Sequence, residues 1–256
     1  MSAGGGAADR SGAVFLLTDY TLQGPYVGQL HGRILQATAP PPQAIDLMHD
    51  APAFRPDRAA YLLAAILPHL PAHAAVLAVV DPGVGTDRHA LAMQVDGRWL
   101  VGPDNGLLAV AAGRAERVQA YRLPPPAADT PATFHGRDVF ADVAAVAASH
   151  GTVPAGATAV AHWQGQDWPA DWDAVIYQDG FGNLITGRRA ATVAPGASLA
   201  MAGCRLPGVA KFADVAPGEA CWYANAMGLV EVAVNAGSAA EALAVGPGAA
   251  LHWSGA

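Results

Sequence analysis

Four polar segments within the first 138 residues combine residue types that move protons and pair with charge. They are Thr18-Asp19, Asp81-Pro82-Gly83-Val84-Gly85-Thr86-Asp87-Arg88, Gly102-Pro103-Asp104-Asn105-Gly106 and Thr133-Phe134-His135-Gly136-Arg137-Asp138. Carboxylates and imidazoles act as general acids and bases, and guanidinium groups pair with anions. The glycines let the backbone approach a ligand closely. A strand-end aspartate is also common in turns and caps, and Asp138 could serve only as the N-cap of the helix that follows.

Short apolar runs and helical patterns alternate around these segments. The runs Ala13–Leu17, Ile45–Leu47 and Val76–Val80 predict strands, and Pro25 and Pro56 open helices at a position that proline tolerates. This β-α-β-α-β order predicts a parallel sheet with right-handed crossovers. Because such sheets bind ligands at the carboxyl ends of their strands, the polar segments after the first and third strands are expected at the binding edge.

Each predicted helix has one apolar face. The inward residues expected are Val27, Leu30, Ile34 and Leu35 in the first helix and Ala60, Leu63, Ala64 and Leu67 in the second, which ends at Pro68. His31 stands in the middle of the first helix and is interpreted as a packed or surface residue.

The rest of the chain divides near residue 170. Asp96-Gly97 predicts a hairpin between 91–95 and 99–101, and 138–149 predicts a helix that Gly151 closes. Residues 151–172 resemble a linker, and short strands follow at barrel-like spacing. We therefore predict an α/β chain with two domains. A Rossmann-like α/β domain with a parallel sheet covers 13–165, and a smaller all-β barrel domain covers 172–256.

Composition excludes several function classes. Hydrophobic residues make up 52% and charged residues 14%, the formal charge is -7, and the absence of a basic run argues against nucleic-acid binding. Cys204 and Cys221 lack zinc or disulfide spacing, and the histidines lack ligand spacing, so no metal is expected. No dinucleotide or P-loop fingerprint is present. The segment 1–12 lacks the apolar region of a signal peptide, and no apolar run is long enough to span a membrane, so a cytoplasmic protein is expected.

Taken together, the motifs resemble one family, the S-adenosyl-L-methionine (SAM) hydroxide adenosyltransferases. They stand in the family's order from about residue 13 to about residue 252. The ordered set consists of Leu17-Thr18-Asp19-Tyr20, Pro25-Tyr26-Val27-Gly28, Val79-Val80-Asp81-Pro82-Gly83-Val84-Gly85-Thr86, Gly102-Pro103-Asp104-Asn105-Gly106-Leu107, Thr133-Phe134-His135-Gly136-Arg137-Asp138, Asp179-Gly180-Phe181-Gly182-Asn183 and Glu231-Val232-Ala233-Val234-Asn235-Ala236-Gly237-Ser238.

The resemblance implies a reaction and an assembly. SAM and water would give adenosine and methionine without a metal or an organic cofactor. The two-domain subunits would form a homotrimer, with each active site between the N-terminal domain of one subunit and the C-terminal domain of the next.

The resemblance also assigns residues to the site. The family's Asp-Arg-His set falls on Asp81, Arg88 and His135. The substrate-binding positions fall on Asp19 and Phe54 for the ribose, Asp179 for the methionine ammonium, Phe181, Asn183 and Phe212 around the adenine, and Asn235 and Ala236 at the adenine edge.

These assignments suggest a hypothesis for the chemistry. Attack at ribose C5′ expels a neutral thioether, so the difficulty lies in making water a nucleophile. Arg88 and His135 would hold one water in line with the C5′–S bond, and Asp81 would fix them or accept the proton. Asp19 would accept hydrogen bonds from the ribose hydroxyls.

One difference from the related halogenases and one departure from the family pattern bear on the function. The related SAM-dependent halogenases have a tyrosine at the position of Asp81 and a halide-contacting serine at that of Gly136, so both residues here favour water over halide. The family usually has Asn-Ser near the methionine carboxylate, whereas this chain has Asn225-Ala226, which removes one hydrogen bond to a charged group. The alternatives are therefore a halogenase that forms a 5′-halo-5′-deoxyadenosine, and a module that binds SAM or adenosine without turnover.

Overall fold

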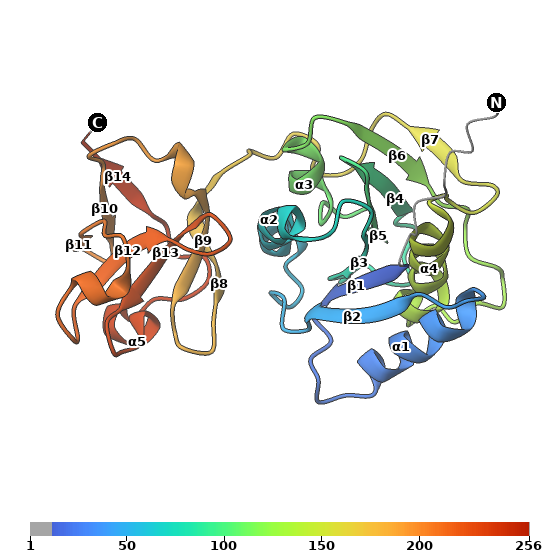
Figure 1. Cartoon of the computed structure of the whole chain (residues 1–256), viewed down its shortest axis with the longest axis horizontal. Coiled ribbons are helices and arrows are strands. Elements are labelled where there is room, and N and C mark those ends of the chain that lie inside the picture. The colour runs from blue at the N-terminus through green and yellow to red at the C-terminus, as the bar shows by residue number, and fades with distance from the viewer. Residues whose placement is uncertain (1–11, 256) are drawn as a thin grey trace, which may run out of the picture. The chain divides into compact units, whose positions relative to one another are not determined.

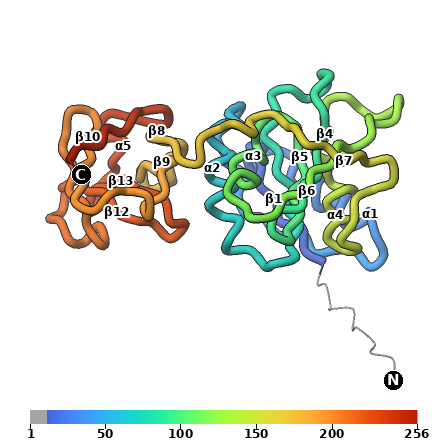
Figure 2. Tube along the Cα trace, turned by 90° about the horizontal axis from the view of Figure 1, so that it is seen from above, coloured from blue at the N-terminus to red at the C-terminus, as the bar shows by residue number. Residues whose placement is uncertain are grey.

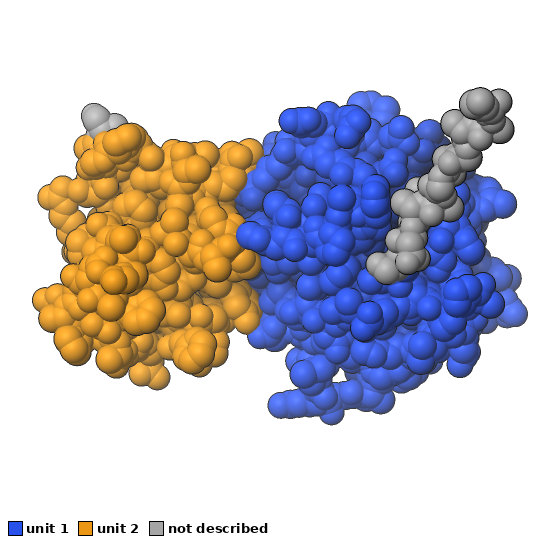
Figure 3. Space-filling model, viewed as in Figure 1, with its two compact units in different colours: residues 1–168 blue, residues 169–256 orange. Residues whose placement is uncertain are grey.

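The computed structural model describes residues 12–255, and the chain divides into two compact units, residues 1–168 and 169–256 (Figure 3). The interpretation of the first eleven residues as a segment without a signal peptide lies outside the described residues. The chain passes from the first unit to the second after strand β7 (Thr158–Val160) (Figure 2).

A seven-stranded sheet forms the centre of the first unit (Figure 1). Its strand order is β2-β1-β3-β5-β4-β6-β7. The other strands are β1 (Ala13–Thr18), β2 (Gln43–Met48), β3 (Ala75–Val79), β4 (Ala90–Val95), β5 (Arg98–Pro103) and β6 (Val118–Arg122). The neighbours β2, β1, β3 and β5 pair parallel, whereas β4, β6 and β7 pair antiparallel. The predicted α/β class is confirmed, but the sheet is mixed because the chain turns back on itself after β4.

That reversal occurs at the predicted hairpin. Asp96 and Gly97 have φ angles of 46° and 89°, which the two central residues of a type I′ turn require. The turn pairs Val95 with Arg98, so β4 adds antiparallel beside β5.

Helices cover both faces of this sheet (Figure 1). Helices α1 (Tyr26–Ala37) and α4 (Ala141–His150) pack together on one face, and α2 (Pro56–Ile66) and α3 (Ala109–Gly113) pack together on the other. The apolar core between the sheet and α1 and α4 includes Leu16, Leu77 and Phe140. Both faces of the central strands are therefore removed from water, which explains their unbroken apolar sequence.

Three local predictions need correction. Val27, Leu30 and Ile34 of α1 are buried, but Leu35 is 58% exposed because successive helical residues point about 100° apart. A π-helical turn (Gly136–Phe140) precedes α4, and Asp138 lies inside it and pairs with Arg137 instead of capping the helix. The predicted linker 151–172 contains β7, which pairs with β6 at the sheet edge.

The second unit consists of two antiparallel sheets and a short helix. One sheet has the order β12-β13-β9-β8 and the other has the order β11-β10-β14. The elements are β8 (Trp172–Gln178), β9 (Leu184–Arg189), β10 (Ser198–Met201), β11 (Cys204–Leu206), β12 (Ala220–Ala224), β13 (Leu229–Val234), α5 (Ala239–Leu243) and β14 (His252–Ser254). Val175, Leu199, Val230 and Leu251 belong to their common core, so the unit has a hydrophobic centre of its own.

Every helix formed by residues 12–255 is too short or too polar to span a membrane.

Candidate active site

Asp81, Arg88 and His135 form one hydrogen-bonded group in the first unit. Asp81 lies two residues after β3, Arg88 two residues before β4, and His135 directly before the π-helical turn. Arg88 Nε lies 3.0 Å from each carboxylate oxygen of Asp81, and its Nη2 lies 2.5 Å from Asp81 Oδ2. The same Nη2 lies 3.0 Å from His135 Nδ1. Segments far apart in the sequence therefore meet at a single guanidinium group.

Little of this group reaches solvent. The side chains of Asp81 and Arg88 are 5% and 11% exposed, and His135 is buried. The guanidinium carbon of Arg88 also lies 5.2 Å from the ring centroid of Phe140, within cation–π range. Loss of either charged partner would leave the other charge buried without compensation, which makes separation of this pair costly.

The contact with Arg88 determines which nitrogen of His135 carries a proton. Arg88 only donates hydrogen bonds, so His135 Nδ1 accepts, and in the neutral ring Nε2 carries the hydrogen. Burial, followed by the nearby Arg88 charge, lowers the pKa of His135 below its usual value. No residue that the structure describes hydrogen-bonds Nε2, so this N–H is left to donate to a ligand.

The loop between Asp81 and Arg88 holds its shape through its own backbone. The amide of Val84 donates to the carbonyl of Asp81, and the Thr86 hydroxyl donates to the carbonyl of Gly83. Gly85 has a φ of +79°, and a Cβ there would lie 2.9 Å from the carbonyl oxygen of Ala132. A glycine is therefore required where this loop packs against the segment that leads to His135.

A pocket of about 380 Å³ opens beside the group. Its lining residues include Asp19, Phe54, Asp81, His135 and Gly136. The backbone amide of Phe54 donates to Asp19 Oδ2 at 3.2 Å, and burial raises the pKa of Asp19. Phe54 itself is 73% exposed, so it presents an aromatic ring at the pocket mouth. The structure thus places two predicted ribose residues and two members of the Asp-Arg-His set around one cavity.

Aromatic side chains that the sequence analysis did not single out form another part of this lining. Tyr20, Tyr26 and Phe134 stack edge-on or tilted, with centroids 5.4 to 5.9 Å apart. Their positions within the motifs around Asp19 and His135 were the only available signal.

The segment 102–106 has a structural role in this unit. Asn105 Nδ2 donates to the carbonyl of Val80, and Asp104 Oδ1 accepts from the amide of Gln164. These bonds tie the end of β5 to the end of β3 and to a later loop. Neither residue lines the pocket beside Asp81.

The predicted adenine and methionine residues gather in the second unit. Asp179, Phe181, Asn183, Phe212 and Ala236 line a separate pocket of about 640 Å³. Asp179 Oδ1 accepts the backbone amides of Phe181 and Asn183, both at 2.9 Å, and its Oδ2 accepts the Asn183 side-chain amide. Phe181 and Phe212 are 81% and 51% exposed, which leaves both aromatic rings open to a ligand.

Asn235 supports this pocket from outside its lining. Its Nδ2 donates to the carbonyl of Val215 at 2.7 Å, its backbone amide donates to Glu219, and its carbonyl accepts from Gly218. Both backbone groups of Asn235 therefore have partners within the unit, whereas Ala236 next to it faces the pocket.

A buried carboxylate beside this pocket belongs to one of the motifs, but the sequence analysis assigned it no role. Glu231 is 7% exposed in β13, and it accepts hydrogen bonds from the Tyr223 hydroxyl and from Asn225 Nδ2. Asn225 Oδ1 accepts the amides of Met227 and Leu229, so this side chain shapes the turn that contains Ala226. A single charge within an otherwise apolar strand was the signal in the sequence.

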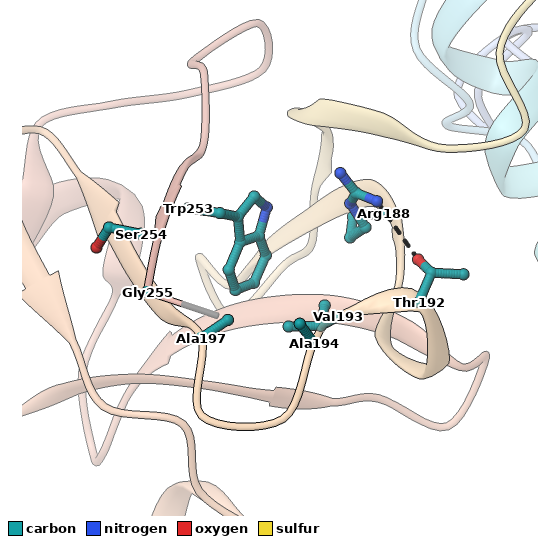
Figure 4. Close-up of a pocket in the computed structure, with 8 residues that line it drawn as sticks. All are labelled: Arg188, Thr192, Val193, Ala194, Ala197, Trp253, Ser254 and Gly255. Carbon is teal, nitrogen blue, oxygen red and sulfur yellow. Dashed lines mark hydrogen bonds between the residues drawn. The ribbon is translucent and has the colours of Figure 1, made fainter.

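Another pocket in the second unit contains none of the predicted residues. It measures about 250 Å³ and lies between Trp253, Arg188 and the loop 192–197 (Figure 4). Asp173 accepts hydrogen bonds from Arg188 Nε and from the Trp253 indole, so the arginine charge is already paired. Among residues 12–255, no group of three or more His, Cys, Asp or Glu side chains is arranged to hold a metal ion.

Comparison with known families supports the resemblance. The model of the SAM hydroxide adenosyltransferase N-terminal domain matches residues 14–156, and that of the C-terminal domain matches residues 173–252.

Two relatives share the name (R)-S-adenosyl-L-methionine hydrolase. The protein from Thermus thermophilus is 40% identical over 259 residues, covering 92% of this chain and 96% of the relative. The protein from Salinispora tropica is 38% identical over 252 residues, covering 92% and 95%.

Solved structures show the same likeness. A conserved protein from Thermotoga maritima has a TM-score of 0.83 at 27% identity, with 94% of this chain and all of that chain covered. A conserved protein from Thermus thermophilus has a TM-score of 0.73 at 36% identity, with 94% and 99% covered.

Proposed function

Because the chain belongs to the SAM hydroxide adenosyltransferase family, we propose that it hydrolyses SAM to adenosine and L-methionine. The observation that supports this most is the Asp81–Arg88–His135 group beside a pocket that also contains Asp19. A buried carboxylate, a fixed cation and an imidazole N–H can together orient a water molecule and stabilise negative charge on it.

The reaction needs one bond to form and one to break. The water oxygen attacks ribose C5′, the C5′–S bond breaks, and its electron pair returns to sulfur, which leaves as the neutral thioether of methionine. One proton is released from the water. Since a cation and a developing hydroxide lose charge together, a pocket with little water favours the transition state.

The hydrogen-bond directions divide the roles. His135 Nε2–H donates to the water oxygen, because Nδ1 is occupied by Arg88. Arg88 holds the imidazole and adds positive charge where hydroxide develops. Asp81 holds Arg88 and is the carboxylate of this group, so it receives the proton. Asp19 accepts hydrogen bonds from the ribose hydroxyls, and Phe54 packs against the ribose.

The second group of residues binds the rest of the substrate. Asp179 pairs with the methionine ammonium, Phe181, Asn183 and Phe212 surround the adenine, and the backbone of Ala236 meets its edge. Asn235 keeps Ala236 in place. The turn that contains Ala226 lacks the serine hydroxyl, so only its backbone groups are left to bind the methionine carboxylate.

We also propose the assembly and location that the resemblance implies. The two antiparallel sheets of the second unit act as the barrel domain, and the first unit acts as the Rossmann-like domain. The chain works as a cytoplasmic homotrimer in which the N-terminal domain of one subunit and the C-terminal domain of the next complete each site. Sedimentation equilibrium tests this directly, because a monomer at micromolar concentration contradicts it.

The configuration at sulfur is part of the proposal. The sulfonium of SAM is stereogenic, and the names of the relatives specify the (R) epimer. We propose that this chain prefers the same epimer.

The function is tested by incubating the protein separately with the (S) and (R) epimers of SAM and quantifying adenosine and methionine. Equal amounts of both products, formed faster from the (R) epimer, support the proposal. Binding without products over hours identifies a binding module instead. A 5′-halo-5′-deoxyadenosine formed in chloride or fluoride identifies a halogenase.

A further inference from the structure

A buried polar pair outside the proposed catalytic group joins the ends of β1 and β2. Thr18 is 0% exposed and His49 is 5% exposed, and Thr18 Oγ1 lies 2.7 Å from His49 Nδ1. Neither residue lines the pocket beside Asp81. Buried polar groups in a hydrophobic unit are costly unless they are hydrogen-bonded, so this contact stabilises a specific arrangement.

A strand irregularity places a carboxylate at the other side of the same imidazole. The β1–β2 register shifts between Leu16 and Leu17, so one extra residue of β2 lies between Asp46 and Met48. His49 Nε2 lies 3.0 Å from Asp46 Oδ1, within ion-pair distance but outside hydrogen-bond geometry, although side chains three apart in a regular strand point to opposite faces. The same Asp46 oxygen lies 2.7 Å from Nε2 of His31 in α1.

The contacts of Thr18 and His49 with the backbone lie around Asp19. The Thr18 hydroxyl accepts the amide of Tyr20 at 3.2 Å, and the carbonyl of His49 accepts the amide of Thr21 at 2.6 Å. The carbonyl of Thr18 accepts the amide of Ala51. The residues before and after Asp19 are thus tied to the segment that leads to Phe54, whose amide donates to the Asp19 carboxylate.

We propose that His49 is a positioning residue that fixes the Asp19 carboxylate for the ribose through Thr18. This inference rests on the proposed function. The nearby negative charge of Asp46 favours the proton on His49 Nε2, which leaves Nδ1 to accept the Thr18 hydroxyl, whose oxygen accepts the Tyr20 amide. The side chains of Asp46 and His31 are 41% and 35% exposed, and the contact between them holds the Asp46 carboxylate next to His49.

The test compares two threonines that are equally buried. Thr18→Val keeps the shape of the side chain and removes its hydroxyl. Thr186→Val removes a hydroxyl that is also 0% exposed and donates to the carbonyl of Val230 in the second unit, outside the adenine pocket lining. Both variants should lose thermal stability, and a purely structural role would make their kinetics alike.

We expect Thr18→Val to raise KM for SAM about fivefold to tenfold with kcat within twofold of wild type, and Thr186→Val to leave both constants unchanged. His49→Asn keeps an acceptor near the Nδ1 position, whereas His49→Gln does not. We therefore expect His49→Asn to retain most of the affinity for SAM and His49→Gln to lose it. Equal KM values for the two threonine variants would overturn the proposal.

A second measurement does not depend on hydrolysis. Hydrogen exchange at the amide of Phe54 reports the bond to Asp19, so it should quicken about tenfold in Thr18→Val and stay unchanged in Thr186→Val. If wild-type protein forms no adenosine, the proposed function fails, while this exchange still decides whether His49 and Thr18 hold Asp19. Unchanged exchange in Thr18→Val overturns the positioning role.

Discussion

Replacing Asp81 by Asn removes one negative charge from the buried group and keeps its shape. The substitution leaves the Arg88 guanidinium, only 11% exposed, next to a neutral imidazole and without its counter-ion. One of the two carboxylate oxygens that accept from Arg88 becomes an NH₂ group, which faces the N–H donors of the arginine.

The size of the effect follows from the burial of the pair. Removing one partner of a buried ion pair costs about 3–5 kcal/mol because the remaining charge has lost its solvent and its partner. The protein avoids part of this cost if Arg88 turns toward water, but the 3.0 Å contact with His135 Nδ1 is then lost. We therefore expect Asp81→Asn to lower kcat at least 100-fold and to lower the free energy of unfolding by about 3 kcal/mol.

The assay measures adenosine formation under saturating SAM, together with urea unfolding. Asp142→Asn is the matched control, because Asp142 pairs with Arg33 in the same forked geometry between α1 and α4, where both side chains are more than a third exposed. That exposed pair contributes at most about 1 kcal/mol, so its loss should leave kcat unchanged. A kcat within threefold of wild type for Asp81→Asn would refute the catalytic role of the buried group.

Three further predictions concern residues in or beside the pocket next to Asp81 and the adenine pocket of the second unit. A Cβ at Gly136 would lie 2.3 Å from the Tyr20 hydroxyl, so Gly136→Ser should displace that ring. We expect this variant to lower kcat/KM at least tenfold and to produce no halonucleoside in chloride. The control is Gly28→Ala, whose new methyl group would meet no atom within 4 Å and should have no effect. Burial and Arg88 lower the pKa of His135, so its ring is neutral at pH 7. We therefore expect kcat/KM to fall only below about pH 6.5, where the stability that the neutral ring contributes is lost as well. A midpoint above pH 7 contradicts this. Glu231→Gln leaves one oxygen to accept from both Tyr223 and Asn225, so unfolding free energy should drop by about 1–3 kcal/mol and KM should rise about fivefold; unchanged calorimetric binding of SAM would argue against this.

The parts of the fold that depend on local chemistry could be predicted from the sequence. Pro25 and Pro56 stand at the beginning of α1 and α2, the dipeptide Asp96-Gly97 makes the hairpin, and Gly151 closes α4 with a φ of +66°. Each of these features is fixed within a few residues, so spacing alone contains the information.

Features that depend on distant contacts were harder to predict. The mixed order of the sheet follows from where β4, β6 and β7 find partners, and β7 has only three residues, too few for a periodic pattern. Leu35 fits an apolar spacing yet faces solvent, because the neighbouring elements cover only one side of α1.

The contacts within the site also include local ones, which the sequence indicates, and distant ones, which it does not. Asp81 and Arg88 lie in one glycine-containing loop, so their contact is local, whereas His135 reaches Arg88 from 47 residues away, and only the family resemblance placed it there. The Glu231 network and the His49–Thr18 pair join residues on different strands or at the ends of different strands. Nothing in their spacing indicates these contacts, because the sheet register creates them.

The most direct test of the account follows the oxygen atom of the water. SAM is hydrolysed in ¹⁸O-enriched water, and the adenosine is analysed by mass spectrometry with fragmentation of the ribose. Attack by water at C5′ predicts one ¹⁸O atom in the 5′-hydroxyl of adenosine and none in methionine. Adenosine that forms without the label, or label that appears only in methionine, contradicts the claim that the Asp81–Arg88–His135 group directs a water molecule at C5′.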